Sequence, residues 1–298
     1  MISDPRQLVD PAFFAQLESI ELRARGIVEG FLHGLHRSPF IGYSVEFASH
    51  REYSPGDDLR HVNWKLYARS QRLYVKEFDA ETNLNLYILL DVSRSMDCAN
   101  AGISKRDYGA ALAAALAHLA LKQHDAAGIS LFADTVLAHL DPKARPNQLD
   151  EILRAITTTG SQAATGTGLA IQQAAELARH RGLVVVISDL FDDLQAVVEG
   201  LEHLRFRHHE VLLFHLWDPW ERRLPLEGHI RFHDLETRQE LTTQAEGVQH
   251  EYQLRVDRFC ADVENECLNR GIERVELTTD QPLDLALRDY LVRRAKVY

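Results

Sequence analysis

The sequence has few cysteines, and they form no recognisable motif. Its 298 residues include three, Cys98, Cys260 and Cys267, and none belongs to a CxxC pair. Without such a spacing, we expect them to be small buried hydrophobic side chains. Cys260 and Cys267 lie about two helical turns apart, so we expect them to share one face of a helix.

The sequence also lacks long apolar runs and an excess of positive charge. Its longest apolar runs, such as residues 183–187, are far shorter than the roughly 20 residues of a membrane span. The N-terminus has no basic region followed by an apolar core, so we expect no signal peptide and a cytoplasmic protein. A formal net charge of −11 argues against nucleic acid as a partner, because a phosphate backbone needs a basic face.

Several catalytic signatures are missing as well. The chain has no GxxxxGK[ST] loop, so we do not expect it to bind ATP by itself. It has no GxSxG elbow, which excludes an α/β-hydrolase nucleophile. The histidines, for example His33, His36 and the pair at 208–209, show no zinc spacing with supporting cysteines, and we expect them to be solvated or locally bonded.

What the sequence does have, from residue 84 onward, is an alternation of strand-like and helix-like patterns. Short apolar runs at 84–90 and 183–188 suit strands buried on both faces, and each is followed by a carboxylate, Asp91 or Asp189. The pattern predicts further strands at 127–132, 135–140 and 210–216, and helices at 107–123, 147–157, 168–180 and 194–206. We therefore predict an α/β fold with a doubly wound, mostly parallel sheet. Ligands of such sheets bind outside the carboxyl ends of the strands.

The alternation breaks near residue 217, and this break suggests the domain organisation. The sequence then predicts a polar hairpin at 230–241, a long helix at 249–270, a strand at 272–277 and a helix at 283–295. Upstream, residues 13–35 look helical and residues 43–78 look like strands and turns. We predict an N-terminal extension, 1–82, packed on a main domain, 83–298, with an insertion at about 217–247.

One cluster of oxygen-bearing side chains suits a small hard cation. Asp91 comes directly after a buried strand, and Ser93 and Ser95 project from the loop beyond it. Mg²⁺ prefers about six oxygen ligands at roughly 2.0–2.1 Å. We predict a site whose ligands are Asp91, Ser93, Ser95, Thr165 and Asp189. The alternative is that the serines satisfy loop backbone groups and that Thr165 or Thr167 caps a helix.

The same segments resemble known families. Residues 91–96 (DVSRSM), 165–168 (TGTG) and 188–189 (SD) resemble the metal-ion-dependent adhesion site of von Willebrand factor type A domains. Upstream, SVEF, REYSPGDDLR, Trp64-Lys65, Ala68-Arg69 and LYVKE resemble the bacterial domain of unknown function 58 family, where this segment precedes a type A domain. The chain has Asn63 where that family usually shows an aspartate, so an ionic role for that position does not carry over.

The resemblance implies a type A fold and the five ligands named above. It also implies an association with AAA+ ATPases of the MoxR class and an adaptor role. Many relatives carry membrane spans, which this sequence lacks. Thr167, Arg60 and Trp64 are candidate partner-binding residues. Alternatively, residues 53–69 form a turn in which Arg60 pairs with nearby acids and Trp64 packs the segment down.

Three functional hypotheses follow. The first is a non-enzymatic protein-binding module in which Mg²⁺, or Mn²⁺ or Ca²⁺ instead, bridges to an acidic side chain of a partner. Only two of the five ligands carry charge, so the metal stays electrophilic towards that side chain. The second is a magnesium-dependent phosphohydrolase with Asp91 as nucleophile, although such enzymes usually have an acid where this chain has Ser93. The third is a scaffold with a degenerate metal site whose interface lies before residue 84.

Overall fold

The computed structural model describes residues 44–52, 63, 66–67, 72–81, 84–100, 102–161, 166–233 and 240–283. The chain divides into two compact units, one at Leu32–Asn83 and one that includes everything from Leu84 onward. In the first unit, β1 (Ser44–Glu52) and β2 (Tyr74–Glu81) form an antiparallel ribbon with a register shift between Phe47 and Ser49.

Asn63, the departure from the family pattern, has a structural role in this first unit. Its backbone N–H donates to the Tyr74 carbonyl at 2.8 Å. Its side-chain Oδ1 accepts the Leu66 N–H at 3.2 Å. An amide oxygen therefore provides the acceptor that a carboxylate would also provide, without the negative charge.

The second unit contains a six-stranded sheet in the order β10-β7-β6-β3-β4-β5. All neighbouring strands are parallel except β5, which runs antiparallel to β4 at one edge. The strands are β3 (Asn85–Asp91), β4 (Ala126–Phe132), β5 (Val136–Lys143), β6 (Leu183–Ser188), β7 (Glu210–Trp217) and β10 (Glu273–Thr278). The predicted doubly wound, mostly parallel sheet is confirmed.

The strand order reverses between β3 and β6. From β3 the chain builds outward through β4 to β5, whereas from β6 it builds the other way through β7 to β10. Ligands of doubly wound sheets bind at this reversal, outside the carboxyl ends of the strands. Asp91 ends β3 and Asp189 follows β6, so both lie at the reversal.

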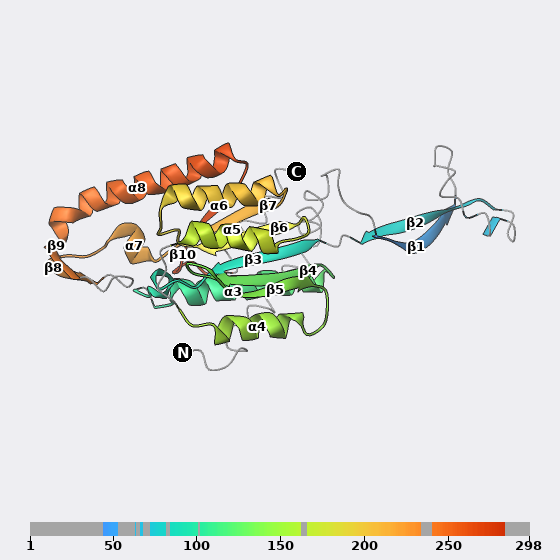
Figure 1. Cartoon of the computed structure of the whole chain (residues 1–298), viewed down its shortest axis with the longest axis horizontal. Coiled ribbons are helices and arrows are strands. Elements are labelled where there is room, and N and C mark those ends of the chain that lie inside the picture. The colour runs from blue at the N-terminus through green and yellow to red at the C-terminus, as the bar shows by residue number, and fades with distance from the viewer. Residues whose placement is uncertain are drawn as a thin grey trace. The chain divides into compact units, whose positions relative to one another are not determined.

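Helices cover both faces of the sheet (Figure 1). One face carries α5 (Thr167–Leu177), α6 (Leu194–Phe206) and α8 (Ala245–Asn269); the other carries α3 (Lys105–Lys122) and α4 (Gln148–Thr158). Gly109 lets α3 approach closely, since a Cβ there would lie 3.1 Å from Leu90 and 3.2 Å from Ile187. Gly168 does the same for α5 and α6, because a Cβ there would meet the Ala196 carbonyl at 2.3 Å.

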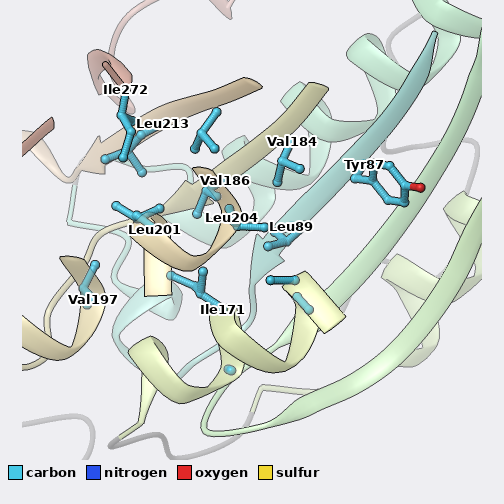
Figure 2. Packing of buried hydrophobic residues seen from close by; sticks show 14 of the residues in the cluster. Tyr87, Leu89, Ile171, Val184, Val186, Val197, Leu201, Leu204, Leu213 and Ile272 are labelled. Carbon is cyan, nitrogen blue, oxygen red and sulfur yellow. The ribbon is translucent and has the colours of Figure 1, made fainter. Parts of the chain in front are cut away.

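Alternate residues of the central strands point to opposite faces, which explains their continuous apolar sequence. Figure 2 shows Leu89, Val184, Val186 and Leu213 packed against residues of α5 and α6, such as Ile171. This cluster also contains Cys267 of α8. Cys260 and Cys267 are buried, as predicted, whereas Cys98 is only partly buried.

Between β7 and α8 the chain leaves the main pattern. It forms the short helix α7 (Pro219–Arg223) and then a two-stranded antiparallel sheet of β8 (His229–His233) and β9 (Glu240–Gln244). The predicted polar hairpin is therefore present. The helix predicted at 13–35, and all but the first residue of the one predicted at 283–295, lie outside the described residues. Among the described residues, no helix has both the length and the apolar character needed to cross a bilayer.

Candidate functional site

The carboxylate of Asp91, at the carboxyl end of β3, is held by hydrogen bonds from two other residues. The residue is 1% exposed. Its Oδ1 accepts the backbone N–H of Ser93 at 2.8 Å, and its Oδ2 accepts the hydroxyl of Ser188 at 2.6 Å. The loop after β3 and the end of β6 therefore both hold the same carboxylate.

The two serines predicted as ligands lie side by side next to Asp91. Their hydroxyl oxygens are 3.0 Å apart. Ser95 begins the short 3-10 helix η3 (Ser95–Asp97), and the completely buried Met96 anchors that loop in the core. Neighbouring ligands of an octahedral ion with bonds of about 2.1 Å are also about 3.0 Å apart. The loop therefore presents two hydroxyls at a separation that suits one shared cation.

Asp91 lies close to a second carboxylate, that of Asp189. Burial, and then the neighbouring Asp189, raise the pKa of the Asp91 carboxyl to about 7. Among the described residues, no Lys, Arg or His forms an ion pair with Asp91. A buried carboxylate without a counter-charge is costly, so a cation at this position would stabilise it. Asp91, Ser93 and Ser95 thus fit a small divalent ion that keeps part of its water shell.

Asp189, the other predicted carboxylate, is in a different situation. Its Oδ2 accepts from Lys105 Nζ at 2.7 Å, and its Oδ1 accepts the Phe191 N–H at 3.2 Å. The same Lys105 ammonium lies 2.6 Å from Glu221 Oε2 and 4.5 Å from the centre of the Phe191 ring. Asp189 therefore has a counter-charge of its own, and one of its oxygens is already occupied.

Lys105 keeps its charge in a completely buried position. Burial lowers the pKa of its ammonium group, but Asp189 and Glu221 outweigh that effect and raise the pKa above its ordinary value. Burial raises the pKa of Glu221, and Lys105 opposes the rise. The sequence prediction missed this cluster. Its only signal is a basic residue in the first turn of α3, where the helix dipole disfavours positive charge.

A neutral histidine supports the backbone at Asp189. Arg274 can only donate, so its Nη2 donates to His215 Nδ1 at 2.9 Å. His215 Nε2–H then donates to the Asp189 carbonyl at 3.1 Å. Burial and the nearby Arg274 lower the pKa of His215 to about 3, which keeps the ring neutral. The carbonyl that follows β6 is therefore held by a donor that carries no charge.

The remaining predicted site residues are placed only in part. Thr167 begins α5 and is buried, and its backbone N–H donates to Asp192 Oδ2 at 2.6 Å. Thr165, Arg60 and Trp64 lie outside the described residues. Within the described part of the chain, no three His, Cys, Asp or Glu side chains group together as metal ligands. Any cation site there must depend on hydroxyls as well as carboxylates.

Four exposed apolar side chains belong to segments that follow the carboxyl ends of β3, β6 and β7 or to the start of α5. Ile103 precedes α3, and Leu169 lies in the first turn of α5. Phe191 and Trp220 follow the carboxyl ends of β6 and β7. We call these four residues the apolar rim. Exposed apolar side chains gathered near a polar site are typical of protein-binding surfaces.

The chain is similar to several proteins whose function is not stated. The proteins called "Uncharacterized protein Rv1480" of Mycobacterium tuberculosis and "Uncharacterized protein Mb1516" of Mycobacterium bovis are both 29% identical to it over 231 residues. The matched region covers 76% of this chain and 72% of each relative.

Two solved structures also match 72% of this chain. The conserved hypothetical protein BatB from Bacteroides thetaiotaomicron is 19% identical, with 99% of its chain covered and a TM-score of 0.44. An aerotolerance-related membrane protein from Bacteroides fragilis is 15% identical, with 100% of its chain covered and a TM-score of 0.48.

A family model also matches most of the chain. The family described as "Protein of unknown function DUF58" matches residues 49–259, well over half of the chain. The matched range includes residues 51–77 of the upstream segment, Asp91, both serines and Asp189. This protein therefore belongs to the DUF58 family.

Proposed function

We propose that this protein is a non-enzymatic protein-binding module whose binding site is the carboxyl edge of the sheet. Asp91, Ser93 and Ser95 hold a divalent cation there, with Mg²⁺ as the first choice and Mn²⁺ or Ca²⁺ as alternatives. Thr165 is a further proposed ligand, although it lies outside the described residues. The cation supplies an open coordination position to an acidic side chain of the partner.

The observation that carries this proposal is the buried, unpaired charge of Asp91 beside two hydroxyls. The carboxylate is buried without a cationic partner among the described residues, and the serine oxygens are 3.0 Å apart. Asp189 and Glu221 share the single ammonium of Lys105, and Asp91 lies close enough to Asp189 for that carboxylate to raise the pKa of Asp91. This local excess of negative charge favours a cation, and the cation in turn favours an acidic ligand.

The apolar rim supports a protein as the partner rather than a small molecule. Leu169 of α5 is 61% exposed, and Trp220 of α7 is 41% exposed. Protein interfaces usually combine a buried apolar core with polar contacts, so exposed apolar side chains beside a polar site are compatible with a protein partner. The partner we propose thus presents an Asp or Glu within an apolar surface.

The cellular role we propose is that of an adaptor or assembly factor working with a MoxR-class AAA+ ATPase. Its support is the resemblance of the sequence motifs, and the missing phosphate-binding loop means that ATP would be bound by the partner. A cytoplasmic location stays a prediction from the sequence.

Calorimetric titration of the purified chain with MgCl₂ and MnCl₂ tests the metal part of the proposal. We expect binding by wild type and none by Asp91→Asn, because an amide keeps the hydrogen-bonding shape and loses the charge. Asp97→Asn is the matched control, since Asp97 lies in the same loop with an exposed carboxylate. Equal binding by wild type and Asp91→Asn would remove the basis of the proposal.

Capture of interacting proteins tests the binding part. Tagged wild type is incubated with lysate of its source with Mg²⁺ or with EDTA, and recovered MoxR-class ATPases are quantified by mass spectrometry. We expect recovery that needs Mg²⁺ and is lost in Asp91→Asn. Hydrolysis of p-nitrophenyl phosphate by wild type, absent in Asp91→Asn, would instead favour the phosphohydrolase.

A further inference from the structure

We propose that Lys105 is a built-in competitor of the divalent cation, which keeps Asp189 from acting as a ligand and thereby limits the affinity of the site. The inference rests on the proposed function and deepens it, because it assigns the residue that sets which cations bind and how tightly. Lys105 belonged to none of the motifs that predict the site.

The geometry places the competing charge on a predicted ligand. Lys105 Nζ lies 2.7 Å from Asp189 Oδ2, and its side chain is 0% exposed. The ammonium is fixed from the other side by Glu221 Oε2 at 2.6 Å. It cannot swing into solvent without breaking both ion pairs. A cation that used this oxygen of Asp189 would have to displace it.

The start of α3 delivers Lys105 to this position. Ser104 caps the helix by accepting the Asp107 N–H at 3.0 Å. The Lys105 N–H donates to the Cys98 carbonyl at 3.1 Å, in the segment that follows Ser93 and Ser95. The loop that carries the two serines and the helix that carries the ammonium are therefore tied together.

A purely structural role does not require a charge at this position. A buried ion pair costs more desolvation than an apolar side chain of similar volume, and the helix dipole adds to that cost. The charge does have one clear effect on the site. Of the two carboxylates among the five predicted ligands, it neutralises Asp189 and leaves Asp91 without a counter-charge among the described residues.

This effect predicts a preference among cations. Ca²⁺ takes six to eight oxygen ligands, often from several carboxylates, whereas Mg²⁺ keeps water and uses one or two carboxylates. With Asp189 occupied, the site suits Mg²⁺ or Mn²⁺ better than Ca²⁺. It also keeps a position for the partner's carboxylate that a second aspartate would otherwise fill.

The experiment measures Mg²⁺, Mn²⁺ and Ca²⁺ binding by calorimetry on wild type, Lys105→Met and the double variant Lys105→Met/Asp189→Asn. Methionine keeps the length of the side chain and removes its charge. We expect Lys105→Met to bind Mn²⁺ at least about tenfold more tightly than wild type, with the largest relative gain for Ca²⁺. The double variant should lose that gain, because the released carboxylate is gone.

Circular dichroism and thermal unfolding report whether each variant folds. If Lys105→Met does not fold, Lys105→Met/Glu221→Gln replaces it, since this change also removes the second carboxylate that the lysine neutralised. The same gain in affinity is expected in that background. Asp189→Asn alone should weaken wild-type binding by less than about tenfold, whereas Asp91→Asn should abolish it.

The outcomes separate this inference from the proposed function. Tighter binding in Lys105→Met that disappears with Asp189→Asn supports the role of Lys105. Binding by wild type with no gain in Lys105→Met overturns that role and leaves the cation-dependent module standing. Binding by Lys105→Met but not by wild type supports the role and overturns cation dependence of the natural protein. Absence of binding in both overturns both.

Discussion

The ends of β3 and β6 read alike in the sequence and differ in their charge environment. Each strand is buried, and each leads into a buried aspartate at the reversal of the sheet. Asp91 is held by a backbone N–H and a hydroxyl, which are neutral donors. Asp189 is held by the ammonium of Lys105. Among the described residues, no counter-charge pairs with Asp91, which is why we propose this aspartate as the ligand of the cation.

A sequence motif therefore specifies which polar atoms lie at a site, but not which opposite charges lie beside them. The charge balance is set by a residue from elsewhere, here 84 positions away along the chain.

Removing the ammonium should have the largest effect on stability. Lys105→Met leaves Asp189 and Glu221 as buried carboxylates without a counter-charge. We expect the free energy of unfolding to fall by about 3–5 kcal/mol at pH 8. Urea denaturation without added metal measures it. Adding Glu221→Gln should restore part of the loss, and a loss that this second change does not relieve would show that packing, not charge, is responsible.

A third buried aspartate, Asp125, is a reference for an unpaired carboxylate away from the site. It precedes β4 at the opposite end of the strand and accepts the Leu84 N–H at 3.0 Å. Burial raises its pKa to about 7, so the folded state holds a proton that the unfolded state releases near pH 4. Its contribution to stability is therefore favourable at low pH and is lost as the pH rises from about 4 to about 7.

Asp125→Asn should remove that loss of stability. We expect the variant to exceed wild type by about 2–4 kcal/mol above pH 7 and to differ little below pH 4. Urea denaturation of both proteins from pH 4 to pH 8 measures the difference. A difference that does not change with pH would contradict the assignment.

Adding a divalent cation should stabilise the folded protein only when Asp91 is present. At a Mg²⁺ concentration ten times its dissociation constant, the free energy of unfolding should rise by about 1.4 kcal/mol. Asp91→Asn should show no rise, and Asp189→Asn should keep part of it. Thermal unfolding with MgCl₂, against an equal ionic strength of NaCl, measures the effect. An equal rise in all three proteins would indicate binding elsewhere.

Neutralising an exposed acid in the same loop should have the smallest effect. Asp97 is 3.7 Å from Arg106, and its side chain is 44% exposed. Asp97→Asn should change the free energy of unfolding by less than about 0.5 kcal/mol, because solvent screens the pair. The same urea series measures it. A loss several times larger would mean that the loop itself, rather than Asp91, carries the charge sensitivity.

Much of the fold could be predicted because its signals are local. The uninterrupted apolar strands β3 and β6 are easy to recognise, since both of their faces are covered by helices. The start of α3 was predicted at residue 107, but the helix begins at Lys105 after the Ser104 cap. A basic residue in the first turn of a helix is unfavourable, because the helix dipole places a partial positive charge there. It is tolerated here because acids from other elements surround it.

The candidate site could be predicted only where its residues are close in sequence. Asp91, Ser93 and Ser95 lie within five residues, and the structure brings them together. Their role as ligands stays a prediction. Ser188 was recognised only as part of a motif and Lys105 was missed, because nothing near them in the sequence shows which carboxylate they contact. Their partners are set by the pairing of β3 with β6 and by the packing of α3 on the sheet.

The hydroxyl of Ser188 and the carboxylate that it contacts are 97 residues apart, and they meet only because β6 pairs beside β3. A growing chain released before β6 would carry the serine loop without the strand that completes its surroundings. Because such long-range pairing forms slowly, the surroundings of the Asp91 carboxylate are complete only after β6 has paired with β3. A partner that binds through the proposed cation would therefore bind only completely folded molecules.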